Sequence, residues 1–196
     1  MPTPTVKDAV AQLIKNLSQV GVLTAILLAM GSVAGEKESG TAAFVLVKPV
    51  SRFAFIAAKF SGIAVTIAAA VILSGSAAYL YTELLFAQLS VLGFAAACLV
   101  ILLGLLEIAA VTFLGSTLVR SPMPAAGIGL VALVIAGIVS SLPNIGHFTP
   151  FGLNELAMNL ALQQTATGWN WPLIANAGFV VVALAASWLA FRRQEI

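Results

Sequence analysis

Charged residues are scarce in this sequence. Only 8% of its 196 residues are Asp, Glu, Lys or Arg, whereas 61% are hydrophobic. A soluble domain usually carries about 25% charged residues. Nine basic and seven acidic side chains are too few to cover the surface of a soluble protein this long, but lipid can solvate apolar side chains. The composition therefore excludes an ordinary soluble domain and predicts one transmembrane domain over residues 1–196.

Cysteine and histidine are nearly absent as well. The one cysteine, Cys98, cannot form a disulfide within the chain. The one histidine, His147, is a poor metal ligand by itself, because zinc sites need three or four ligands. No Ser–His–Asp set and no paired carboxylates occur at membrane depth, so we expect no catalytic residues, no bound metal and no enzyme. The net charge of only +2 gives no basic surface for nucleic acid.

Long apolar runs account for most of the chain. A transmembrane helix needs about 20 consecutive apolar residues, and the first run lacks the features of a cleavable signal peptide. The runs predict an all-α polytopic membrane protein with about five transmembrane helices. The predicted spans cover about 17–35, 55–81, 90–118, 124–142 and 172–191.

Two shorter helices are expected outside the spans. Residues 6–16 have an amphipathic pattern, which predicts a short helix on the outer membrane surface. Residues 143–171 form the longest outer segment, and 154–162 within it predict an interfacial helix. Small residues at four-residue spacing in the first span (Gly21, Ala25, Ala29) favour close helix packing, with a partner in this chain or in another.

Basic residues cluster in alternate connections, which predicts the orientation of the chain. They occur between the first two spans, between the third and fourth, and after the fifth, but not in the other two connections. We therefore expect a multi-pass protein of the cell membrane with a cytoplasmic C-terminus and an outer N-terminus. The residues are Lys37, Lys48, Arg52, Lys59, Arg120, Arg192 and Arg193.

The polar stretch before the second span reads GEKESGTAAFVLVKPVSR. Gly40 suits the left-handed conformation that ends a helix, and Thr41 can cap a short apolar helix over 42–47. Pro49 would end that helix, because proline has no backbone N–H to donate. Ser51 is a good N-cap for the second span. The pattern therefore predicts a short helix that lies across the cytoplasmic face.

This stretch, together with a lysine at the start of the next span, resembles the cytoplasmic signature of ABC transporter type-2 permeases. The resemblance covers nearly the whole chain, as spans two to six of that family. The family normally has six spans. A short variant, a trimmed start or a first span supplied by another subunit would each account for the difference. The matching positions are Glu36, Lys37, Glu38, Gly40, Thr41, Pro49, Val50, Ser51, Arg52 and Lys59.

The resemblance implies a coupling segment at 36–52 that docks on a separate cytoplasmic ABC ATPase. The short apolar helix, with Phe44, would be the buried contact, and the charges at Glu36, Lys37, Glu38 and Arg52 would set its register on the partner. ATP and Mg would bind the partner and not this chain. The resemblance further implies an exporter that pairs with a second permease copy or a homologous permease within membrane lipid.

Three alternatives stay open at this point. The charges of 36–52 could simply solvate a loop and fix topology. The chain could also be a non-transporting component that uses an ABC ATPase for mechanical, sensing or assembly work. Glu107, in the middle of the third span, costs about 2.5–3.5 kcal/mol if ionised. It is either a functional site, as a polar lining of a substrate path or a proton-linked group, or a protonated or hydrogen-bonded side chain that ties helices together.

Overall fold

The computed structural model describes residues 5–41, 51–86, 89–165 and 168–194, and all regular structure within those ranges is helical. This confirms the all-α prediction. The predicted helix over 42–47, with Phe44 and Pro49, lies outside the described residues. The described elements are α1 (Val6–Met30), α2 (Ala34–Glu38), α4 (Arg52–Phe86), α5 (Val91–Leu118), α6 (Pro122–Ser140), the 3-10 helix η1 (Gly146–Phe148), α7 (Leu153–Ala161) and α8 (Asn170–Arg192).

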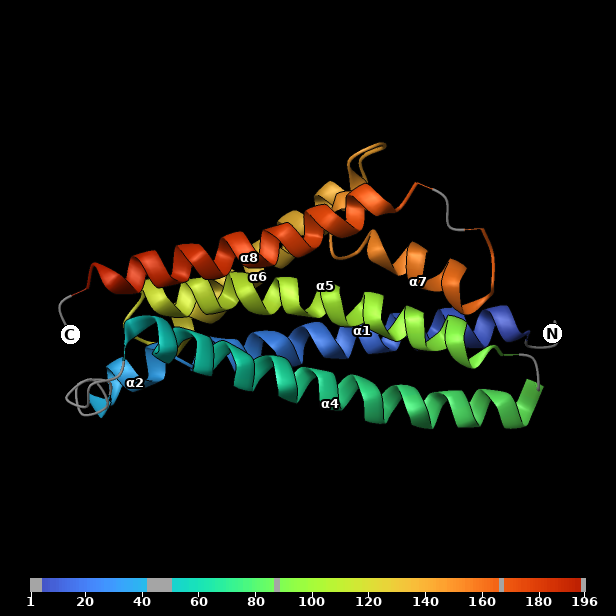
Figure 1. Ribbon diagram of the computed structural model, residues 1–196, viewed down its shortest axis with the longest axis horizontal. Coiled ribbons are helices and arrows are strands. Elements are labelled where there is room, and N and C mark those ends of the chain that lie inside the picture. Colours follow the sequence, from blue (N-terminus) through green and yellow to red (C-terminus); the bar gives the residue numbers. More distant parts are fainter. Residues whose placement is uncertain (1–4, 42–50, 87–88, 166–167, 195–196) are drawn as a thin grey trace.

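Five long helices run along the length of the molecule and place the two termini at opposite ends (Figure 1). These are α1, α4, α5, α6 and α8, and each is long and apolar enough to cross a membrane. They match the predicted spans to within a few residues, except at the start of the first. The chain is therefore a multi-pass, all-α membrane protein. Helices suit this environment because they satisfy their own backbone hydrogen bonds in lipid.

Helix α5 is the centre of the bundle, because it contacts α1, α4, α6, α7 and α8. Its side chains Ala109, Ala110 and Phe113 are fully buried. A Cβ atom added to Gly21 of α1 would lie 2.8 Å from Leu105 of α5. The small-residue stripe of the first span is therefore used, at this position, for close packing inside this chain.

The N-terminal residues differ from the prediction. Residues 6–16 do not form a separate surface helix but are the first turns of α1, which is 25 residues long. A capping box starts this helix: Thr5 Oγ1 accepts from the Asp8 N–H at 3.3 Å, and Asp8 Oδ2 accepts from the Thr5 N–H at 3.0 Å. The prediction of a surface helix was wrong because its apolar face, with Val10 and Ile14, is buried in the bundle.

The short helix predicted over 154–162 is present as α7, which confirms that these residues are helical, whereas their interfacial position stays a prediction. Helix α7 packs on α5 and on α1, at the end of the bundle that carries the N-terminus (Figure 1). Its buried side chains Leu153, Leu156 and Ala157 form an apolar face against these helices.

Candidate functional site

One end of the bundle carries the C-terminus, helix α2 and the start of α4 (Figure 1). Six basic side chains of the described residues belong to this end, which we call the basic end. Seven of the residues predicted for coupling also lie here, namely Glu36, Lys37, Glu38, Gly40, Thr41, Ser51 and Arg52. The six basic residues are Lys37, Arg52, Lys59, Arg120, Arg192 and Arg193.

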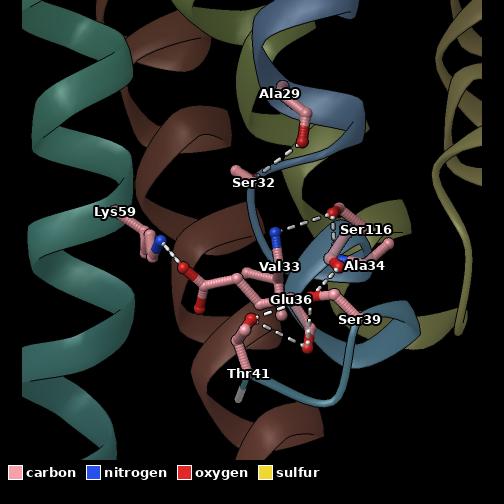
Figure 2. Close-up of polar contacts among 10 residues, drawn as sticks. Ala29, Ser32, Val33, Ala34, Glu36, Ser39, Thr41, Lys59 and Ser116 are labelled. Atoms are coloured by element: carbon pink, nitrogen blue, oxygen red, sulfur yellow. Dashed lines mark hydrogen bonds and ion pairs between the residues drawn. The ribbon is translucent and has the colours of Figure 1, made fainter. Parts of the chain in front are cut away.

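The first span is interrupted at the basic end, where α1 ends at Met30 and α2 begins at Ala34. The buried hydroxyl of Ser116, on α5, bridges the two helices (Figure 2). It donates to the Met30 carbonyl at 2.8 Å and accepts from the Val33 and Ala34 N–H groups at 3.2 and 2.9 Å. These are the backbone groups that a helix end leaves without a partner. Ser116 therefore fixes where α2 leaves the membrane-spanning helix.

Helix α2 is tied to α4 by an ion pair between Glu36 and Lys59 (Figure 2). Both side chains are partly buried, and Lys59 Nζ also lies 5.6 Å from the centre of the Phe55 ring. The second carboxylate oxygen of Glu36 is buried and has no hydrogen-bond partner among the described residues. A partly buried pair of this kind holds the two helices in one relative position.

Lys37 binds the C-terminal end of α5. Its Nζ donates to the Thr117 carbonyl at 2.5 Å and to the Val119 carbonyl at 3.5 Å. It also donates to Gln194 Oε1 at 2.6 Å, beyond the end of α8. The last carbonyl groups of a helix lack intrahelical donors and carry partial negative charge. A lysine here satisfies these groups and links α2 to both α5 and the C-terminal tail.

Arg52 binds the C-terminal end of α8 in the same way. Its Nη1 donates to the carbonyls of Phe191, Arg192 and Gln194 at 2.9, 3.1 and 2.6 Å. Beside it, the Phe191 ring stacks on Phe55 of α4 with centroids 5.1 Å apart. We call Lys37 and Arg52 the carbonyl clamp, because both bind carbonyl groups at helix ends.

The clamp changes the interpretation of the predicted charges. Glu36, Lys37 and Arg52 face helices of their own chain, whereas Glu38 is exposed. A direct contact with a partner therefore fits Glu38 better than the other three. Ser39, Gly40 and Thr41, which follow Glu38 in the chain, are exposed as well, and so is Ser51 just before α4.

Two of the predicted backbone signals around this segment, those of Gly40 and Ser51, are confirmed. Gly40 has a φ of 71°, the left-handed conformation expected after a helix. Ser51 Oγ accepts from the Ala54 N–H at 3.1 Å and so caps the start of α4. The side chain of Thr41 bonds Ser39 Oγ at 2.8 Å (Figure 2), and the helix that Thr41 is predicted to cap lies outside the described residues.

Sequence reasoning missed three residues of this site: Ser116, Thr117 and Gln194. Ser116 and Thr117 sit in an apolar run and are fully buried, while Gln194 follows the last span. The only signal in the sequence is a pair of hydroxyl residues near the end of a transmembrane helix. Such residues often bond their own helix, so the pattern alone does not indicate a tertiary bridge.

Glu107 lies apart from the basic end, in the middle of α5. Its side chain is 6% exposed, and its Oε2 atom has no hydrogen-bond partner in the part of the chain that the structure describes. Ten residues of helix separate it from Thr117, or about 15 Å. Within the described ranges, no group of three or more His, Cys, Asp or Glu residues could hold a metal ion. The structure thus does not join Glu107 to the predicted coupling residues.

This arrangement defines the molecule as a polytopic α-helical membrane protein. At its basic end, side chains from one helix bond the ends of helices that are distant in the sequence. The chain belongs to the family described as "Protein of unknown function (DUF2705)", which matches residues 3–196. It is also similar to "Uncharacterized transmembrane protein YxlG" of Bacillus subtilis (strain 168). The two are 28% identical over 195 residues, which cover 98% of this chain and 75% of the relative.

Proposed function

We propose that this chain is the membrane-spanning permease subunit of an ATP-driven ABC exporter. In this proposal, segment 36–52 couples the chain to a separate cytoplasmic ATPase. The observation that carries the proposal is the carbonyl clamp. Lys37 and Arg52 stand on either side of residues 42–50 and bind the ends of α5 and α8. A displacement of either described end, at Lys37 or at Arg52, would therefore be passed on to α5 or α8.

The transmission has a physical basis in the packing. Packed cores resist compression and transmit strain. A displacement of α2 or of the start of α4 is therefore transmitted to the helices that are bonded to them. Helix α2 is fixed to α4 by Glu36–Lys59 and to α5 by Ser116 and Lys37. Helix α4 is fixed to α8 by Arg52. The resemblance of GEKESGT and KPVSR to the permease signature supports the same function.

The remaining parts of the proposal follow from this assignment. ATP and Mg bind the partner ATPase, and this chain hydrolyses nothing itself. The basic end faces the cytoplasm of the cell, in line with the preference of Lys and Arg for cytoplasmic loops. The permease works with a second copy or a homologous permease in the same membrane.

Co-purification tests the coupling role directly. The full chain is solubilised gently from its native membrane, captured, and the proteins retained are quantified by mass spectrometry. We expect a stoichiometric ABC-type ATPase with the wild-type chain. Glu38→Lys should lower the amount of retained ATPase about two- to five-fold, the effect of one exposed charge pair. Glu155→Lys, the same change at the opposite end, is the matched control. Absence of any ATPase from the wild-type sample would overturn the proposal.

The alternative function, a non-transporting membrane component, would use the same carbonyl clamp and the same ATPase partner. A non-transporting component would retain the ATPase but move no solute. Reconstitution of the purified complex into vesicles separates the two, because an exporter must couple ATP hydrolysis to solute movement across the bilayer. An ATPase activity that no solute stimulates, with no change in vesicle contents, would favour the non-transporting component.

A further inference from the structure

A hollow of about 450 Å³ lies between α1 and α7, at the end of the bundle opposite the basic end. We call it the α1–α7 cleft. Its volume falls within the range of about 300–1,000 Å³ that is usual for small-molecule sites. Its walls are mostly apolar and include Ile14 of α1, Met158 of α7 and Phe151 just before α7. The cleft therefore offers an apolar contact surface away from the proposed coupling site.

Two opposite charges line the same cleft. Lys15 comes from α1 and Glu155 from α7, and both side chains are exposed. They form no ion pair with each other, although Glu155 Oε2 lies 3.8 Å from His147 Nδ1. Between the two helices, Ser18 Oγ donates to Asn154 Oδ1 at 2.8 Å. The cleft thus combines an apolar wall with one cation, one anion and a polar bridge.

The position of the cleft along the bundle indicates that it lies near the boundary between lipid and water. Helix α8 begins at the same end as α7 (Figure 1), with Trp169 as its N-cap and Trp171 75% exposed. Tryptophan gathers at the boundary between lipid and water, at the level of lipid headgroups. A cleft with apolar walls and two opposite charges at this boundary is complementary to a headgroup that is itself a zwitterion.

We propose that the α1–α7 cleft binds the headgroup of a zwitterionic aminophospholipid from the adjoining leaflet. Glu155 pairs with the ammonium group, Lys15 pairs with the phosphate, and the apolar wall contacts the glycerol and upper acyl chains. An anionic headgroup without an amine would satisfy Lys15 alone. The proposal is independent of the proposed transport function, because a lipid can occupy this cleft whether or not an ATPase binds the basic end.

The test uses the purified full chain in a maltoside detergent, which carries no charge of its own. The probe is dioleoyl-phosphatidylethanolamine, and bound lipid is counted by native mass spectrometry. Dioleoyl-phosphatidylglycerol has the same tails but no amine, and we expect less of it to be retained. Lys15→Gln and Glu155→Gln should each lower phosphatidylethanolamine retention about two- to five-fold. The matched controls Lys7→Gln and Glu38→Gln lie outside the cleft and should leave retention unchanged.

Two further measurements locate the lipid and identify its source. A photoactivatable phosphatidylethanolamine should crosslink to peptides of α1 or α7, and crosslinks confined to other helices would overturn the proposal. Soluble phosphoethanolamine at equal concentration should not displace the lipid, because it lacks the apolar contacts. Displacement by the free headgroup, equal retention of the two lipids, or equal loss with the control variants would each contradict an aminophospholipid site.

Discussion

The hydroxyl of Ser116 satisfies the backbone groups at the break between α1 and α2. It meets three backbone groups around the break between α1 and α2, and all three would otherwise lack a partner at a helix end. A helix in lipid has no water to satisfy such groups, so their loss is costly. Ser116 thereby allows a transmembrane helix to stop at Met30 while the chain continues as α2.

Removal of this hydroxyl should destabilise the protein measurably. In Ser116→Ala the N–H groups of Val33 and Ala34 lose their acceptor, and each unsatisfied buried group costs about 1–3 kcal/mol. We expect a lower midpoint of thermal unfolding in detergent, with a free-energy loss of about 2 kcal/mol or more. Ser187→Ala is the matched control, because Ser187 is also buried but bonds only Ala183 of its own helix. Equal losses in the two variants would contradict the bridging role of Ser116.

Glu107 is a buried acidic residue in an otherwise apolar part of the chain. It is buried in α5, and the described residues give its Oε2 atom no hydrogen-bond partner. It lies in a helix that is long and apolar enough to cross a membrane, and its role as a polar site stays a prediction. Its place on the central helix is consistent with a role in the bundle interior, where intramembrane acids normally face.

The basic end is organised by helix termini. Helices α5 and α8 both end there, and each directs its last carbonyl groups toward a basic side chain from an earlier part of the chain. Positive charge at a helix C-terminus is favourable because the carbonyl ends carry partial negative charge. Lys37 and Arg52 therefore stabilise two helix ends at once and connect them to the proposed coupling segment.

Loss of the clamp should loosen the last turn of α8. Arg52→Gln removes the charged donor from the carbonyls of Phe191 and Arg192, and a hydrogen bond to a charged group is worth about 1.5–3 kcal/mol. We expect amide hydrogen exchange in residues 190–194 to become about tenfold faster or more. Arg192→Gln is the control, because Arg192 is exposed and its guanidinium lies 5.8 Å from the centre of the Trp188 ring. Unchanged exchange in Arg52→Gln would show that the α8 end holds without the clamp.

The whole molecule has two unlike ends. The basic end combines the clamp with exposed Arg120, Arg192 and Arg193. The opposite end has α7, the tryptophans at the start of α8 and the α1–α7 cleft. Lys and Arg near transmembrane helix ends favour the cytoplasmic side. We therefore propose that the basic end faces the cytoplasm and the opposite end faces the outside of the cell.

Cysteine labelling tests that orientation. Cys98 is the only cysteine, so Cys98→Ala gives a background without thiols. In intact cells, a membrane-impermeant maleimide should label Trp171→Cys at once, because Trp171 is 75% exposed at the end that the proposed orientation places outside. Ser39→Cys and Arg193→Cys should react only after the membrane is permeabilised. The reverse pattern would invert the proposed topology and place the coupling segment outside the cell.

The membrane class, the number of long helices and the backbone signals at Gly40 and Ser51 could be predicted from the sequence. These depend on local properties: runs of about 20 apolar residues, a left-handed glycine and an N-capping serine. The first helix was predicted less well, since its amphipathic start resembles a surface helix until Val10 and Ile14 are seen buried in the bundle.

The directions in which the charged side chains of the basic end face could not be predicted, because they depend on tertiary packing. Lys37 meets Thr117, 80 positions away, and Arg52 meets Gln194, 142 positions away. Spacing and composition carry no information about such pairs, because they form only when the ends of α2, α4, α5 and α8 are packed together. The same packing left Glu38 exposed while Glu36, Lys37 and Arg52 bind their own chain, although in the sequence all four appear as equivalent charges in one polar segment.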